Sequence, residues 1–217
     1  MSIFLINSYI TFPDLPPDQI ANRQAMSFNG TDSYIQVPST SDFAFGTNGF
    51  TITLWVNFNA LTSSGYNILD FRSSGGSSAV GSLWINSSDG LRWYVNGAYL
   101  SADIPASSFS DNAWYNIIIL NNGFTTSFYL NGASIDSASD TTSYAAAPLT
   151  IGRYYAGSYA VDGKLDEVAI FNTALSGPKI KQIYDATAVV GGVPQTANLF
   201  TGGLSSSLVY WNRMGDS

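Results

Sequence analysis

Few residues of this sequence are of the types that carry out acid–base or nucleophilic catalysis. It has 217 residues, no histidine, no cysteine and 15 acidic residues, of which only Glu167 is a glutamate. Zinc sites of Cys and His and Ser–His–Asp triads are therefore excluded. Retaining glycoside hydrolysis needs two carboxyl groups about 5 Å apart. Asp166 and Glu167 are adjacent and point to opposite faces of a strand, so the sequence predicts no enzyme, with an Asp–Asp pair as the catalytic alternative.

Aromatic residues are the second group that could do chemistry, by binding a sugar. Ring faces pack against the C–H surface of a sugar, and nearby polar groups supply the hydrogen bonds. Tyr154, Tyr155 and Tyr159 lie close together in the sequence, and together with Trp93 they are the predicted carbohydrate-binding residues. The rings that could share a sheet face with Trp93 are Trp55, Tyr66, Trp84 and Tyr99. The alternative is that these rings only cover sheet faces.

The charge balance excludes several classes of partner. Eight basic residues against 15 acidic ones give a formal net charge of -7 and a pI near 4.2. Binding to a phosphate backbone needs a basic surface, so we expect no nucleic acid. No run of residues reaches the roughly 20 apolar residues of a membrane span, and the first dozen residues lack the basic start and cleavage site of a secretory signal. We expect no membrane association.

The elements that must position these residues are strands. Apolar residues alternate with Thr, Trp and Asn over Gly49–Phe58, which predicts a strand with one face toward a core. Further strands are predicted at 81–86, 91–96, 98–100, 114–121, 126–131, 149–153 and 164–171. Asn96-Gly97 and Asn131-Gly132 suit the tight turns of hairpins. The sequence thus predicts an all-β fold, an antiparallel jelly-roll β-sandwich.

One short helix and two extensions complete the predicted organisation. Ser176 suits an N-cap, and Ile180 and Ile183 then share one helix face, so a helix follows the last strand. We predict an N-terminal docking arm at 1–26, the sandwich at 27–186 and a C-terminal extension at 187–217. The apolar residues predicted to dock are Phe4, Leu5, Ile6, Tyr210 and Trp211. They could pack on the same sandwich, on a second copy or on another protein.

Six segments within residues 27–186 form a series of known motifs. The first, Ser27–Val37, is close to F-x-G-x-x-x-Y-V, and the last, Gly163–Ser176, is close to G-x-iDEvriyn-x-ALs. Between them lie Phe50–Val56, Trp114, Phe128–Gly132 and Leu149–Arg153. The series resembles laminin-G-like domains of the concanavalin A-like lectin/glucanase superfamily. The resemblance implies the same sandwich over residues 27–186.

The resemblance also implies a metal site. Proteins of this kind often hold a structural Ca²⁺ near the first strand, and the matching positions are Asp32 and Asp166, with Asp162 as a weaker candidate. Backbone carbonyls would complete the six to eight oxygen ligands that calcium takes. The alternative is that Asp32 is a turn residue and that Asp166 accepts a hydrogen bond from the backbone or contacts Lys164.

The last residues carry a narrower resemblance. Tyr210–Asp216 is similar to a YWRMGD segment, with Asn212 inserted, that follows such domains in structural proteins of tailed bacteriophages. It implies a non-enzymatic virion protein on the exterior of the particle, as a capsid decoration, head fibre or tail appendage, assembled in the host cytoplasm. Its expected partners are capsid or tail proteins and further copies of itself, for instance in a trimer. The alternative is a lectin that binds host glycans.

Overall fold

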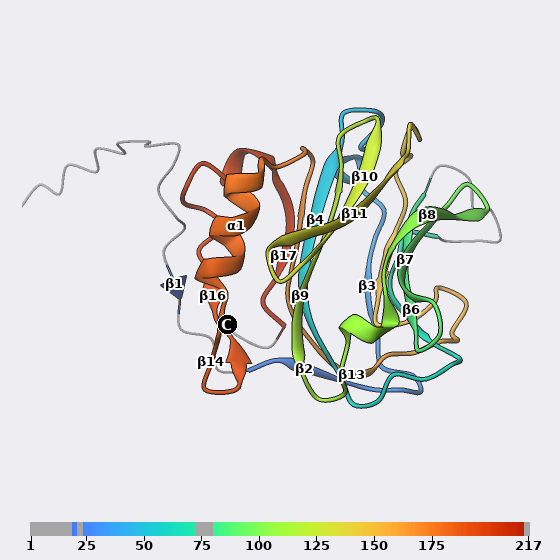
Figure 1. The fold of residues 1–217 in the computed structure, drawn as a ribbon. Coiled ribbons are helices and arrows are strands. Elements are labelled where there is room, and N and C mark those ends of the chain that lie inside the picture. The colour runs from blue at the N-terminus through green and yellow to red at the C-terminus, as the bar shows by residue number, and fades with distance from the viewer. Residues whose placement is uncertain (1–18, 21–23, 73–79, 215–217) are drawn as a thin grey trace, which may run out of the picture.

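Two antiparallel sheets pack face to face in the computed structural model, which describes residues 19–20, 24–72 and 80–214 (Figure 1). One α-helix, α1 (Gly177–Ala186), follows the last long strand within these ranges. The predicted all-β sandwich with a single short helix is therefore confirmed. None of the helices in the described ranges is long and apolar enough to cross a bilayer.

The larger sheet has seven strands in the order β11-β10-β9-β4-β13-β17, with β2 also paired to β13. These are β2 (Met26–Asn29), β4 (Phe50–Phe58), β9 (Trp114–Asn121), β10 (Thr125–Leu130), β11 (Ala133–Ser139), β13 (Asp162–Phe171) and β17 (Leu208–Asn212). The second sheet has six strands in the order β3-β12-β5-β6-β7-β8. These are β3 (Ile35–Val37), β5 (Tyr66–Asp70), β6 (Ser82–Asn86), β7 (Gly90–Val95), β8 (Ala98–Ile104) and β12 (Leu149–Ile151).

Short elements complete the described chain. Two pairs of two-residue strands are β1 (Gln19–Ile20) with β16 (Thr196–Ala197), and β14 (Val189–Val190) with β15 (Val193–Pro194). Single-turn 3₁₀ helices lie at Ser41–Phe43, Ala106–Ser108 and Ser205–Ser207. The pairing of β1 with β16 places a segment that precedes the sandwich in sequence against one that follows it.

The main core lies between the two sheets, where the predicted alternation places it. The inward face of β4 consists of Phe50, Ile52, Leu54, Val56 and Phe58, all buried in this core. The Asn-Gly turns also behave as predicted. Asn96 and Asn131 have φ of 52° and 50°, and the glycine after each also has a positive φ, which matches the twist of the hairpins they close.

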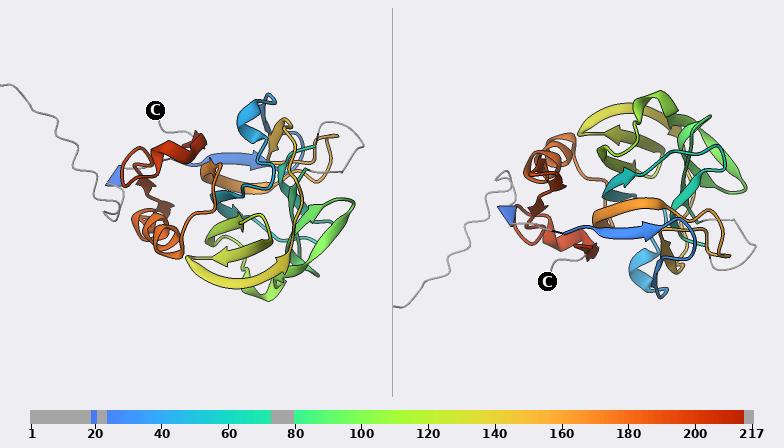
Figure 2. Two further views of the ribbon diagram at one scale, coloured as in Figure 1. Left: turned by 90° about the horizontal axis from the view of Figure 1, so that it is seen from above. Right: turned by 90° about the horizontal axis from the view of Figure 1, so that it is seen from below.

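A second core covers the outer face of the seven-stranded sheet. Figures 1 and 2 show α1 and the C-terminal segment on the side of this sheet that faces away from the six-stranded sheet. Ile180 and Ile183 of α1 pack there against Phe171. Trp55 lies on the outer face of β4, opposite the main core, where its ring stacks on Tyr184 with ring centres 5.9 Å apart and is buried.

Glu167 connects this sheet to the C-terminal segment. It lies at an irregularity of β13, with φ 49°, where the pairing with β4 shifts register. Its carboxylate accepts hydrogen bonds from the Thr196 hydroxyl and, at 3.0 Å, from Trp211 Nε1. The described part of the segment predicted as an extension, 187–217, is thereby attached to the sandwich.

Candidate functional site

A hollow of about 310 Å³ lies on the face of the six-stranded sheet that points away from the core. Side chains alternate between faces along a strand, so Trp84 of β6 and Tyr94 of β7 point outward while their neighbours Leu83 and Trp93 point into the core. The lining residues are Arg72, Ser82, Trp84, Tyr94, Tyr99, Tyr154 and Tyr159. Five of these seven side chains are aromatic.

The rings of the hollow meet edge to face. Trp84 and Tyr159 have ring centres 4.6 Å apart at an interplanar angle of 76°, and Tyr94 and Tyr99 are 5.2 Å apart at 73°. Tyr154 approaches Tyr159 at 6.2 Å and 70°. In a T-shaped pair, one ring turns its edge to the face of the other. Tyr159 remains 46% exposed, so its ring can contact a ligand.

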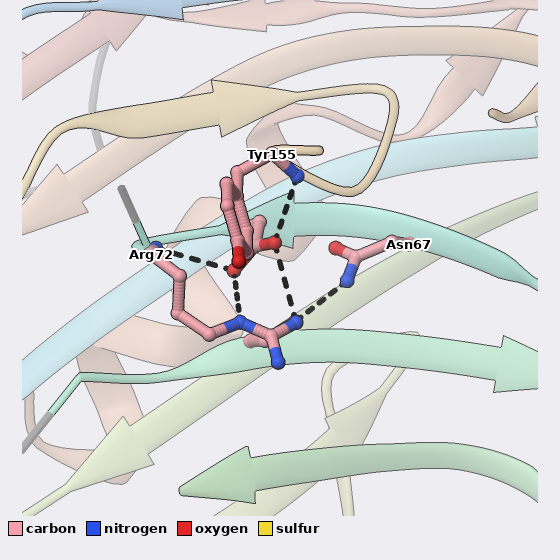
Figure 3. A network of polar contacts seen from close by, with 5 residues as sticks. Asn67, Arg72 and Tyr155 are labelled. Carbon is pink, nitrogen blue, oxygen red and sulfur yellow. Dashed lines mark hydrogen bonds and ion pairs between the residues drawn. The ribbon is translucent and has the colours of Figure 1, made fainter. Parts of the chain in front are cut away.

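Arg72 is fixed in the wall of the hollow by an ion pair with Asp70 at the end of β5 (Figure 3). Its Nε donates to Asp70 Oδ1 at 2.7 Å, and its Nη2 donates to Asp70 Oδ2 at 3.2 Å. Nη2 also donates to Ser82 Oγ at 3.0 Å, and that oxygen lies 2.7 Å from the side-chain amide of Asn67. A charged, two-point contact of this kind orients the guanidinium.

The same guanidinium packs against tyrosine rings. Arg72 Cζ lies 4.8 Å from the ring centre of Tyr154 and 5.1 Å from that of Tyr94, within the range of cation–π attraction. Burial raises the pKa of the Asp70 carboxyl above its ordinary value, while hydrogen bonds from Arg72 and from the backbone N–H of Tyr155 act in the opposite direction. The ion pair and the rings thus form one connected structure.

The loop between β12 and β13 carries the three tyrosines predicted from the sequence. The backbone N–H of Tyr155 donates to Asp70 Oδ2 at 3.0 Å, which ties the loop to β5. Within the loop, Tyr154 N–H donates to the Ser158 carbonyl at 3.0 Å, and Gly157 N–H donates to the Tyr154 carbonyl at 2.9 Å. Gly157 has φ 92°, a conformation that favours glycine. These contacts hold the rings in place before any ligand binds.

The prediction that Trp93 binds carbohydrate is wrong. Its side chain is 1% exposed and lies in the main core, where its Nε1 donates to the Tyr144 hydroxyl at 2.8 Å. Tyr66 also belongs to that core. Of the further rings considered, Trp84 and Tyr99 do line the hollow. The structure therefore brings Tyr154 and Tyr159 together with Trp84 and Tyr99 in the hollow and separates Trp93 from them. Tyr155 does not line the hollow, but its ring centre lies 4.5 Å from that of Tyr154.

The two predicted calcium ligands do not form one donor set. Asp32 follows β2 and accepts from the Asn29 side-chain amide at 2.7 Å. Asp166 is buried in β13, and its Oδ1 accepts from the backbone N–H of Glu167 at 2.9 Å. Asn29, the partner of Asp32, lies opposite Asp162 in the sheet. Asp166 is four residues further along β13, which corresponds to about 13 Å along the strand. Across the described ranges no group of three or more His, Cys, Asp or Glu side chains lies close enough to hold a metal ion together.

The predicted docking residues divide into two groups. Phe4, Leu5 and Ile6 lie outside the described residues. Tyr210 and Trp211 belong to β17, which pairs with β13. Their positions correspond to the alternative in which the C-terminal residues pack on the sandwich of their own chain.

Sequence reasoning did not identify Arg72 and Asp70 as parts of the site. The available signal was a carboxylate and a guanidinium two residues apart at the end of a strand, which places them on the same face. Tyr94 was missed as well, although it follows directly from the burial of its neighbour Trp93. Both assignments need the correct face of each strand, and the aromatic residues alone do not decide it.

Comparison with known families and structures agrees with the fold. The family model described as the concanavalin A-like lectin/glucanases superfamily matches residues 29–181. No curated protein matches the sequence.

Several solved structures share the fold at low sequence identity. A candidate carbohydrate binding protein from Bacteroides ovatus matches with a TM-score of 0.60 and 15% identity, over 93% of this chain and 53% of that one. Domain 4 of an extracellular arabinanase from Geobacillus stearothermophilus, solved with arabinotriose, matches with a TM-score of 0.58 and 16% identity. That match covers 78% of this chain and 80% of the arabinanase domain. A heptameric pentraxin from Limulus polyphemus matches with a TM-score of 0.53 and 16% identity, over 74% of this chain and 81% of the pentraxin chain. The chain thus spans about half of the Bacteroides protein.

Proposed function

The chain belongs to the concanavalin A-like lectin/glucanases superfamily, and from this premise we propose that it binds carbohydrate in the hollow that contains Tyr154 and Tyr159. The observation that carries the proposal is the clustering of tyrosines from a fixed loop with Trp84, Tyr94 and Tyr99 on an outer sheet face. Apolar ring surfaces beside a few oriented polar groups are the usual composition of a small-molecule site. The volume of about 310 Å³ is near the lower limit for such sites.

The chemistry of the hollow suits a sugar in two ways. Tyr159 and Trp84 offer ring surfaces to the C–H groups of a sugar ring. The guanidinium of Arg72 and the tyrosine hydroxyls can bond with sugar hydroxyls. Two similar folds support the proposal: the Bacteroides protein is described as a candidate carbohydrate binder, and the arabinanase domain was solved with arabinotriose.

A tyrosine substitution with a matched control tests the proposal. Tyr159→Ala removes an exposed ring that pairs with Trp84, and we expect it to weaken binding of the best ligand on a glycan array by about tenfold or more, or about 1.4 kcal/mol. Phe124→Ala removes another exposed ring, in the turn between β9 and β10 on the other sheet, and should leave binding unchanged. Equal loss in both variants, or no glycan binding by the unaltered protein, would contradict the proposal.

We propose binding without hydrolysis, because the only glutamate has another role. The carboxylate of Glu167, in β13 of the seven-stranded sheet, accepts hydrogen bonds from the side chains of Thr196 and Trp211. Asp70 is paired with Arg72 of the hollow. Incubation with a glycan that the protein binds should therefore release no reducing ends.

A virion role is a second proposal, favoured by the resemblance of Tyr210–Asp216 to a segment of bacteriophage structural proteins. Tyr210, Trp211 and Asn212 of that segment lie in β17, and Met214 beyond it is buried in the main core. A protein on the exterior of a particle can also bind host glycans, so the two proposals are compatible. Mass spectrometry of purified particles tests the second one, and absence of the protein from them would refute it.

A further inference from the structure

Two arginines at the hollow, Arg72 and Arg92, are each paired with an aspartate. Arg72 lines the hollow. The guanidinium Cζ of Arg92 lies 4.4 Å from the ring centre of Tyr99, another lining residue. Arg72 is paired with Asp70, and Arg92 is paired with Asp89. Each of these two arginines therefore has a neighbouring carboxylate that balances its charge.

The inner pair is the one a ligand cannot easily separate. The side chains of Arg72 and Asp70 are 13% and 0% exposed, whereas those of Arg92 and Asp89 are 23% and 48% exposed. Both oxygens of Asp70 are used by Arg72, and Oδ2 also accepts from the Tyr155 backbone. Removing one member of a shielded pair leaves the other charge uncompensated, which is strongly unfavourable. Asp70 therefore stays in place when a ligand enters.

This arrangement selects the ligand by charge. An acidic sugar would bring a carboxylate or sulfate into an aromatic site that has no uncompensated cation to pair with it. The free-energy cost of removing that anion from water would then not be offset by an ion pair. The formal charge of -7 adds repulsion over a longer range. We propose that the hollow binds neutral saccharides and discriminates against uronic acids, sialic acids and sulfated glycans. The inference rests on the carbohydrate-binding function proposed above.

A glycan array with neutral and acidic members tests this inference. We expect the bound glycans to be neutral, with binding that changes less than about twofold between low salt and about 0.5 M salt, because screening acts on charged contacts. Preference for acidic glycans, with loss of binding at high salt, would overturn the inference while the carbohydrate-binding function stands. If no glycan binds, the proposed function itself fails and the inference fails with it.

Two aspartate variants make the test independent of array composition. Asp70→Asn leaves the charge of Arg72 uncompensated, and we expect affinity for an acidic sugar such as glucuronic acid to rise about tenfold relative to glucose. Asp89→Asn does the same for the more exposed Arg92 and should give a smaller rise. The exposed position of Asp89 makes this variant usable if Asp70→Asn does not fold. No change in the acidic-to-neutral ratio in either folded variant would contradict the inference.

Discussion

A buried chain of hydrogen bonds joins Trp93 to Asp140 on the core side of the six-stranded sheet. Trp93 Nε1 donates to Tyr144 Oη at 2.8 Å, and Tyr144 Oη donates to Asp140 Oδ2 at 2.6 Å. Thr126 Oγ1 donates to the same carboxylate oxygen, also at 2.6 Å. Burial and the neighbouring Asp140 raise the pKa of the Tyr144 hydroxyl far above its ordinary value. Tyr144 therefore stays protonated and acts as a donor.

The burial of Trp93 could have been predicted from its own strand. Leu91 and Val95 are two residues away on either side, and both point into the core. A tryptophan between two apolar residues of the same face shares their environment. The ion pair of Arg72 with Asp70 could not be derived in this way, because its surroundings depend on how β5 pairs with β6 and on a loop distant in sequence.

Trp93→Phe should destabilise the protein without changing its ligand binding. The substitution leaves a cavity in the core and removes the donor to Tyr144, at a cost of about 2–4 kcal/mol in the free energy of unfolding. Urea denaturation measures that cost, and glycan titration of the folded variant measures affinity. Weakened glycan binding at unchanged stability would show that the ring acts in the hollow after all.

At the scale of elements, the C-terminal segment behaves as a third layer. Trp55 Nε1 donates to the Thr187 hydroxyl at 2.9 Å, just past the end of α1. Further along, Leu199 and Leu204 pack in the second core against the outer face of the larger sheet. The segment thus covers the apolar outer face of the larger sheet although its own strands are short.

The sequence could not predict this layer. Strands of two residues such as β14, β15 and β16 are too short to show alternation. The segment is rich in Gly and Ser, a composition typical of loops. By contrast, β4 and β9 were predicted almost to the residue, because their inward faces are continuously apolar and periodic. β11 was missed because its side chains are mostly exposed and polar.

Glu167→Ala should loosen the C-terminal layer selectively. It removes the acceptor for Trp211 and leaves the buried Thr196 hydroxyl without its carboxylate, at a cost of about 2–3 kcal/mol. Backbone amides of 196–197 and 208–212 should exchange with deuterium faster, while those of β4 stay protected. Glu167→Gln keeps a carbonyl oxygen at the same place and should have a smaller effect. Uniform exchange across the sandwich in the alanine variant would contradict this role.

At the scale of the whole molecule, stability must depend on the ionisation of a few buried carboxyl groups. Burial disfavours the charged form of Asp140, but hydrogen bonds from Thr126, Tyr144 and Thr142 outweigh it and hold the pKa of the carboxyl below its ordinary value. Asp70 has the opposite shift, because burial raises its pKa.

The sign of the Asp140 contribution follows from the lowered pKa. Between its folded and unfolded pKa values, the unfolded chain binds more protons, so stability rises with pH. The contribution is complete above the unfolded value of about 3.9 and disappears as pH falls through the folded value. For Asp70, the folded form holds its proton to higher pH, so its contribution decreases as pH rises above the unfolded value. The two groups act in opposite directions, and comparison with a variant is needed to separate them.

Asp140→Asn should isolate the first of these contributions. We expect it to be less stable than the unaltered protein at neutral pH, because the neutral amide has a single acceptor oxygen. If that oxygen accepts from Thr126 and Tyr144 in place of Oδ2, the NH2 group faces the backbone N–H of Thr142, from which Oδ1 accepts. The difference in the free energy of unfolding should shrink as pH falls through the acidic range, since the unaltered Asp140 then becomes protonated as well. Urea denaturation of both proteins at a series of pH values measures this difference, in which the effect of Asp70 cancels. A difference that stays constant down to the most acidic folded condition would mean that Asp140 is not ionised in the core, and that the chain of hydrogen bonds from Trp93 ends on a neutral acid.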